Sequence, residues 1–198
     1  MSIRRLLCLL LCLLTGAVLA QAGPAEVPAA GLRSVQAEFI QEKKMPILAR
    51  PLVSRGLFAF QAPQSLRWEY LQPLHSILLL HGGRMKKLIE RDHGFAEENG
   101  AGLDAMQIVL QDIGSWLDGR FADNPLFLVT RTGERTVVLT PKEPGLQAVI
   151  SRIELQLGAE AGVMERVTIF EGADNSTQLR FTHIVLNREI PAATFTGP

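Results

Sequence analysis

The feature that most constrains this chain is a succession of short apolar segments, which turn residues interrupt at intervals of roughly ten positions. In segments such as Ser151–Leu157, apolar and polar residues alternate strictly, as they do in strands with one buried face. Pro63 marks one of the connections and Gly82-Gly83 another. This spacing predicts antiparallel hairpins.

The strand pattern occurs at many places along the chain. The segments that carry it are Leu57–Gln61, Leu66–Tyr70, Ser76–His81, Arg84–Ile89, Leu126–Arg131, Thr136–Thr140, Ser151–Leu157, Met164–Glu171 and Gln178–Leu186. The segment Leu32–Lys44 fits helical spacing in its first part and alternation in its second, so we expect a short helix that runs into a strand. The last piece, Ala193–Thr196, is short.

One amphipathic helix interrupts the strands and ends near Gly119. The apolar residues that recur along it at steps of three and four are Leu103, Met106, Leu110, Ile113 and Leu117. With the strands, this helix predicts a mainly β fold with a few helices, built on one antiparallel sheet that is long enough to curl.

The first 22 residues have the features of a secretory signal peptide. Arg4 and Arg5 precede the apolar run Leu6–Leu14, and we expect cleavage after Ala20 or Ala22. The run is shorter than an ordinary membrane span. A retained anchor helix and twin-arginine export are the alternatives. Residues 23–198 are then expected to form one exported domain.

Both cysteines, Cys8 and Cys12, lie within this leader. Acylation of a bacterial lipoprotein requires a small residue before the cysteine, whereas Leu7 and Leu11 stand there, so lipidation is not expected. The mature chain would have no thiol for a disulfide, a nucleophile or a metal site, and its stability must come from core burial.

Cleavage would also remove Arg4 and Arg5, which leaves 18 of the 20 basic side chains against 20 acidic ones, a net charge of about −2. Such a balance excludes nucleic-acid binding by bulk charge, and it excludes attachment to an anionic membrane by charge.

Catalytic motifs are absent from the sequence. His75, His81, His93 and His183 form no H-E-x-x-H pair, and no G-x-S-x-G occurs. His81-Gly82-Gly83 is similar to the start of an oxyanion loop, but a hairpin turn accounts for both glycines. We therefore predict no metal, no cofactor and no enzymatic activity; a lipid esterase that uses His81 or His93 is the alternative.

Apolar side chains on both sides of a strand are the remaining signal. In the hairpin Gly56–Tyr70, Leu57 opposes Phe58 and Phe60, and Ile77–Leu80 is apolar on both faces. Strands of this kind need cover on both sides, from a helix or from a ligand. An ordinary filled core is the alternative.

Several short segments follow one another in a characteristic order along nearly the whole mature chain. They are Ser34–Lys43, Ser54–Phe58, Pro63 with Leu66–Trp68, Gln72-Pro73 with Ser76–Leu78, His81–Arg84, Val137–Lys142, and Phe195-Thr196 with Pro198. This ordered set resembles the LolA outer-membrane lipoprotein carriers.

The resemblance implies an incomplete antiparallel β-barrel with a helical lid over a hydrophobic cavity. It also implies a monomeric periplasmic carrier that takes acylated lipoproteins from an inner-membrane releasing transporter to an outer-membrane acceptor. Such a chaperone is needed in outer-membrane biogenesis, because each exposed CH₂ of an acyl chain costs about 0.8 kcal/mol in water.

The resemblance also implies that lipid binds between sheet and lid. The side chains expected there are Leu57, Phe58, Phe60, Leu66, Trp68, Ile77, Leu79, Met106, Leu110 and Ile113. Because a shift of one residue exchanges the two faces of a strand, the pattern leaves the inward face open. We favour Leu66, Trp68 and the side of Leu57.

The chain departs from the family pattern at Ala62. Family members keep an arginine before the proline of the first hairpin, where it holds the lid shut and governs cargo release. Ala62 has no side-chain donor, and Arg55 and Arg67 are the candidates to replace it. This departure favours a divergent carrier, whose cargo is a lipoprotein or a non-protein lipid such as a glycolipid. A LolB-like outer-membrane acceptor is a further alternative.

Overall fold

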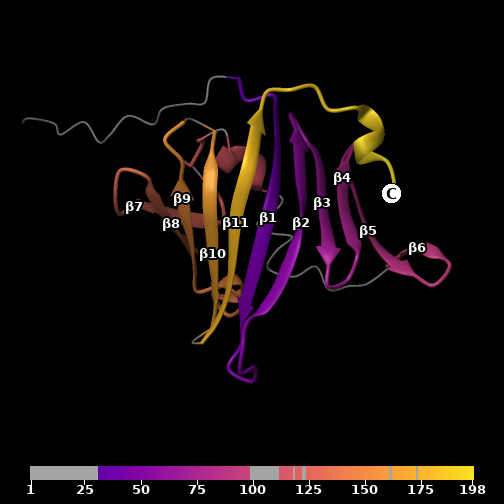
Figure 1. Ribbon diagram of the computed structural model, residues 1–198. Helices are drawn as coiled ribbons and strands as arrows, with labels where there is room; N and C mark the ends of the chain where they lie inside the picture. Colours follow the sequence, from indigo (N-terminus) through magenta and orange to yellow (C-terminus); the bar gives the residue numbers. More distant parts are fainter. Residues whose placement is uncertain (1–30, 99–111, 118, 122–123, 161, 173) are drawn as a thin grey trace, which may run out of the picture.

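The computed structural model describes residues 31–98, 112–117, 119–121, 124–160, 162–172 and 174–198 (Figure 1). The expected leader, residues 1–22, lies outside the described residues, and so do Leu103, Met106 and Leu110. All of the described strands belong to one 11-stranded sheet, and every strand pair in it is antiparallel.

The strands are β1 (Ser34–Lys44), β2 (Leu52–Gln61), β3 (Ser65–Gln72), β4 (Ser76–His81), β5 (Arg84–Arg91), β6 (Gly94–Glu97), β7 (Phe127–Arg131), β8 (Thr136–Pro141), β9 (Arg152–Leu157), β10 (Met164–Glu171) and β11 (Asn175–Leu186). Residues 112–117 are helical, α2 spans Pro144–Gln147, and the 3₁₀ helix η1 spans Ala192–Phe195.

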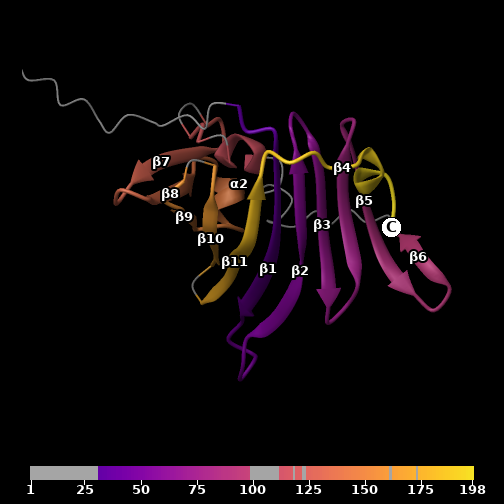
Figure 2. The same cartoon turned by 45° about the horizontal axis from the view of Figure 1, so that its top comes forward.

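The sheet has two wings that meet at the centre. Its strand order is β6-β5-β4-β3-β2-β1-β11-β10-β9-β8-β7, so the first and last strands pair in the middle and each wing is a simple meander. The outermost strands, β6 and β7, do not pair with each other, and the sheet stays open. Figure 2 shows that it curls strongly, because β7 and β8 run across the direction of β2 and β3.

The two faces of the sheet have different covers. We call inner the face that carries Phe58 and Trp68, which pair across β2 and β3. Ile113, Trp116 and Leu117 of the helical segment 112–117 belong to the apolar cluster of this face, the largest in the described chain. The opposite, outer face is crossed by the segment 187–198 after β11, and Ile190 and Phe195 of this segment pack against Ala59 (Figure 1).

Aromatic rings fill the middle of the inner face. Phe39 and Trp68 have ring centroids 4.7 Å apart, and Phe58 meets Trp68 edge to face at 5.4 Å. Tyr70 and Phe181 extend this group to the neighbouring strands. The ring-rich hairpin of β2 and β3 therefore contributes core, and its rings pack against one another in the geometries that aromatic pairs prefer.

The structure confirms the mainly β, antiparallel prediction and most of the individual strands; Ser76–His81 and Met164–Glu171 have the predicted bounds. Three local predictions are corrected. Among the described residues, 31–33 are not helical, and β1 begins at Ser34 with Val35 and Phe39 on its buried, alternating face. The segment Gly94–Glu97, for which the sequence predicted no strand, forms the edge strand β6, and its Phe95 packs against the outer-face cluster that contains Leu88. The end of the chain forms η1 and not a strand.

Candidate functional site

A narrow apolar slit lies between the inner face and the helical segment 112–117. Its walls come from β1, β2, β10, β11 and that segment, and they consist of Val35, Ala37, Phe58, Ile113, Leu117, Met164, Phe181 and Ile184. The free volume inside is about 10 Å³, roughly what one water molecule needs. The helical segment is thus packed closely onto the sheet.

Five of the predicted lining residues meet in the inner cluster. Phe58, Phe60, Leu66, Trp68 and Ile113 are each no more than 5% exposed and belong to one contiguous apolar cluster. Two of them, Phe58 and Ile113, line the slit from opposite sides.

The structure does not bring the other described candidates to this place. Leu57 is 42% exposed on the outer face, and Ile77 and Leu79 form a separate outer cluster with Leu88. The register explains the separation: Leu57 and Ile77 both pair with Glu69, whereas Phe58 pairs with Trp68. The favoured grouping of Leu57 with Leu66 and Trp68 is therefore corrected, because successive side chains alternate between faces.

Other slit residues were missed by the sequence reasoning. Val35 and Ala37 carry a visible alternation in β1, which could have found them. Phe181 and Ile184 are harder to find, because they are three residues apart and simple alternation places them on opposite faces. A break in the register between β1 and β11, with His183 at a φ of 52°, brings both to the slit.

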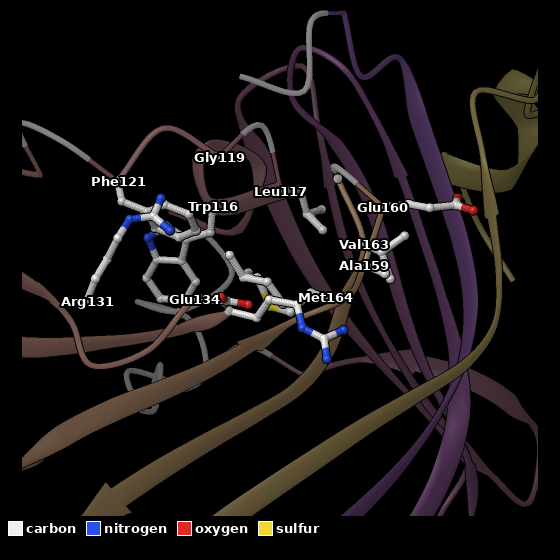
Figure 3. A pocket seen from close by; sticks show the side chains of 14 residues that line it. Trp116, Leu117, Gly119, Phe121, Arg131, Glu134, Ala159, Glu160, Val163 and Met164 are labelled. Carbon is white, nitrogen blue, oxygen red and sulfur yellow. The ribbon is translucent and has the colours of Figure 1, made fainter. Parts of the chain in front are cut away.

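A second, wider pocket of about 260 Å³ opens beside the slit (Figure 3). It lies between the end of the helical segment and the turns that join β7 to β8 and β9 to β10. Leu117 and Met164 line both spaces, so the pocket and the slit adjoin. The remaining lining includes the apolar Trp116, Phe121, Leu157 and Val163 and the charged Arg131, Glu134, Arg135 and Glu160.

Two indole N–H groups in this region have no partner among the described residues. The Nε1 atoms of Trp68 and Trp116 are buried and form no hydrogen bond with any described residue. An indole nitrogen only donates, and a buried donor without an acceptor costs about 1–3 kcal/mol. Trp116 lines the wider pocket, so an acceptor that enters this pocket is close to its ring.

A network of hydrogen-bonded polar side chains lies on the outer face and contacts the C-terminal segment. Arg67 donates through Nε to Glu69 Oε2 at 2.8 Å, and Glu69 Oε1 lies 2.8 Å from His75 Nε2. His75 Nδ1 in turn lies 3.0 Å from Glu90 Oε2. Burial raises the pKa of Glu69, but the hydrogen bonds from Arg67 and His75 outweigh this effect and lower the pKa overall. The hydrogen bond to Glu69 raises the pKa of His75.

The position of the family arginine, Ala62, is exposed in the turn between β2 and β3. Its amide nitrogen donates to the carbonyl oxygen of Arg33 at 2.9 Å. Neither candidate replacement reaches the helical segment, because both arginines lie on the outer face. Arg67 donates to Glu69 and Gly197 there. Arg55 pairs with Ile40, and the next pair along these strands, Gly56 and Phe39, faces inward.

The candidate catalytic histidines have ordinary surroundings. His81 Nδ1 lies 2.9 Å from the hydroxyl of Ser65, but within the described chain no carboxylate contacts the other ring nitrogen. Across the described residues, no group of three or more His, Cys, Asp or Glu side chains is placed to hold a metal ion. None of the helices in the described part is both long and apolar enough to cross a bilayer.

The fold and the site define a class of protein: a single open antiparallel sheet whose inner face is apolar and adjoins an amphipathic pocket. Comparison with known proteins gives a relative. The chain is 26% identical over 176 residues to the outer-membrane lipoprotein carrier protein of Dechloromonas aromatica strain RCB, covering 82% of this chain and 76% of that protein. By this similarity the chain is a divergent LolA-like protein.

Solved structures give more distant likenesses. A LolA superfamily protein from Nitrosomonas europaea has a TM-score of 0.43 at 11% identity, covering 83% of this chain and 90% of that chain. A DUF1329 family protein from Desulfovibrio piger has a TM-score of 0.45 at 10% identity, with the same coverage of 83% and 90%. No family model matches the sequence.

Proposed function

We propose that this protein is a carrier that binds the acyl chains of a lipoprotein or a related amphiphile on the inner face of its sheet. The observation that carries the proposal is the similarity to a lipoprotein carrier over most of the chain. The contiguous apolar cluster of the inner face, with an adjoining pocket open to solvent, supports it.

Binding requires the helical segment 112–117 to move away from the sheet. The slit has a free volume of about 10 Å³, whereas an acyl chain of many carbon atoms needs far more. Separation exposes Ile113, Trp116 and Leu117 together with the facing side chains. An incoming chain offsets this cost, because each CH₂ that it buries contributes about 0.8 kcal/mol. The helical segment acts as the lid in this proposal.

The expected leader and the relative support a proposal for the cellular role. We propose export to the periplasm, acceptance of cargo from an inner-membrane releasing transporter, and delivery to an outer-membrane acceptor. Ala62 favours a cargo or a release step that differs from that of the typical carrier, because no arginine at that place holds the lid. A glycolipid or another non-protein lipid is the second candidate cargo.

Native mass spectrometry of the protein, exported with its own leader and purified, tests the proposal. We expect bound lipid, and we expect the stripped protein to bind a fluorescent palmitoyl peptide in a one-to-one complex. A protein that carries no lipid and leaves the palmitoyl peptide insoluble would contradict the function.

Two matched variants test whether the acyl chain binds on the inner face. Ala37→Leu fills the slit, whereas Ala59→Leu adds the same atoms on the outer face against Phe195. Both alanines are nearly buried, at 7% and 9% exposure, so each variant loses about 1–3 kcal/mol from overpacking. Only Ala37→Leu is expected to weaken lipid binding; equal weakening by both variants would place the acyl chain elsewhere.

A further inference from the structure

The wider pocket and the slit form one amphipathic site. Leu117 and Met164 are common to both, so a molecule in the pocket touches the mouth of the apolar slit. The slit has only apolar walls, whereas the pocket carries four charged side chains on its rim. A molecule that fills both must have an apolar chain and a charged end, and the pocket then receives the head of the cargo.

The wall beside Trp116 supplies donors for an anionic oxygen. Trp116 is 1% exposed, and its indole N–H has no acceptor among the described residues. Figure 3 shows Trp116, Phe121 and Arg131 on the same wall of the pocket, and the Arg131 guanidinium carbon lies 5.8 Å from the centre of the Phe121 ring. Arg131 and Arg135 form no ion pair with a described residue, and a guanidinium is well suited to a phosphate.

The charge of the rim is balanced. Glu134 and Glu160 accompany the two arginines, so an anion without a counter-charge would meet two carboxylates as well as two guanidinium groups. A head that carries a phosphate and an ammonium group complements both kinds of side chain. Charge complementarity therefore favours a zwitterionic head over a purely anionic one.

We propose that this pocket binds the phosphoethanolamine head of a phospholipid whose acyl chain occupies the slit. The phosphate accepts hydrogen bonds from Arg131, Arg135 and the indole N–H of Trp116, and the ammonium group lies against Glu134 and Glu160. This inference rests on the proposed acyl-chain function, and it adds the chemical class of the cargo.

The test uses the two tryptophans of the chain as reporters. The ¹⁵N-labelled protein gives two indole N–H signals by NMR, and Trp68→Phe identifies that of Trp116. The protein is titrated with palmitoyl lysophosphatidylethanolamine and with monopalmitoyl glycerol, which has the same chain but no phosphate. We expect a downfield shift of the Trp116 indole proton with the phospholipid, and a clearly smaller shift with the glyceride.

Two double variants measure how much the pocket arginines contribute to the affinity for the head group. Arg131→Gln with Arg135→Gln is expected to weaken lysophosphatidylethanolamine binding by at least about a hundredfold, since the double variant loses two hydrogen bonds to the charged phosphate. Monopalmitoyl glycerol affinity should stay within about threefold. Arg166→Gln with Arg180→Gln removes two exposed arginines that pair across β10 and β11, and it should leave both affinities unchanged.

The outcomes separate the two proposals. If neither lipid binds, the acyl-chain function fails and this inference fails with it. If both lipids bind with equal affinity and the arginine variants have no effect, the carrier function stands and the head-group site is refuted. If lysophosphatidylglycerol binds more tightly than lysophosphatidylethanolamine, the assignment of an ammonium group to Glu134 and Glu160 is overturned.

Discussion

The guanidinium of Arg67 donates a hydrogen bond to the carbonyl oxygen of Gly197, with 2.6 Å between Nη1 and that oxygen. The same nitrogen donates to the carbonyl oxygen of Thr194 at 3.2 Å, while Nε holds the carboxylate of Glu69 at 2.8 Å. Phe195, between the two carbonyl groups, is 2% exposed. One side chain thus joins a buried carboxylate to the last residues of the chain.

Replacing Arg67 by alanine should lower the free energy of unfolding by about 2–4 kcal/mol, because Glu69 loses its cation while it stays buried. The C-terminal segment should also loosen. Urea unfolding measures the first effect, and faster hydrogen exchange of the Thr196 amide, which donates to Ala193, measures the second.

Arg152 provides the matched control. Its Nε also lies 2.8 Å from a glutamate two residues on, Glu154, but these side chains are 43% and 40% exposed. Arg152→Ala should cost less than about 1 kcal/mol. Equal losses for the two variants would mean that burial and the C-terminal contacts add nothing to the Arg67 pair.

The stability of this network should depend on pH in two directions. The pKa of His75 is raised above its usual value of 6.5, chiefly by the hydrogen bond to Glu69, so its contribution is present below that pH and is lost as the pH rises through the raised pKa. The pKa of Glu69 is lowered below 4.5, because the hydrogen bonds from Arg67 and His75 outweigh its desolvation. Its contribution is present above that value and is lost as the pH falls through the lowered pKa. Both contributions are therefore fully present between pH 4.5 and pH 6.5.

His75→Gln should remove the alkaline part of this dependence. The difference in unfolding free energy between wild type and variant is expected to shrink as the pH rises from about 6 to about 9. Urea titrations across that range measure it. His93→Gln removes an exposed histidine from the turn between β5 and β6 and should keep the wild-type slope. A pH-independent difference for His75→Gln would rule out this role.

Gly56 lies so close to Phe39 that no side chain fits between them. A Cβ atom added to Gly56 would lie 1.9 Å from the carbonyl oxygen of Glu69 and 2.6 Å from Cζ of Phe39. Gly56→Ala should therefore destabilise the protein by more than about 3 kcal/mol, since backbone and a packed ring must both shift.

Gly133, which has room for a side chain, provides the control for Gly56 in thermal unfolding. The nearest atom to a Cβ at Gly133 is 3.7 Å away, in ordinary contact distance, so Gly133→Ala should change the melting temperature by only a degree or two. If Gly56→Ala has the melting temperature of the wild type, Phe39 does not pack closely on β2 at Gly56.

The sequence predicted most of the strands, because alternation and short apolar runs between turn residues are both local signals. β4 has the predicted bounds, because Ser76–His81 is a single apolar run between turn residues. It did not predict β6, since a polar four-residue strand at an edge carries almost no periodic signal. Nor could it assign the inner face. Both faces of β4 are apolar, and only the pairing of Glu69 with Ile77 shows that Ile77 is on the outer side.

Contacts between distant segments were beyond the sequence for a different reason. Arg67 and Gly197 are 130 residues apart, and no local pattern links an arginine to backbone carbonyl groups. The slit shows the same limit, because Ile184 reaches it only through the register break at His183. The sequence therefore predicted the apolar material of the site, and tertiary packing decided which residues share it.

The proposed lid, the helical segment 112–117, lies close to the sheet at Gly114. A Cβ added to Gly114 would lie 3.1 and 3.2 Å from Cζ and Cε2 of Phe60. Gly114→Leu should therefore push the segment away from the inner face, with a loss of about 1–3 kcal/mol in stability. Because the slit then opens, binding of a fluorescent hydrophobic probe should rise, and palmitoyl peptide should associate faster. Gly145→Leu adds the same side chain in α2, where no atom lies within 4 Å of the new Cβ, and should change neither quantity. If Gly114→Leu loses stability while probe binding and association rate remain those of wild type, the segment is a fixed part of the core and does not act as a lid.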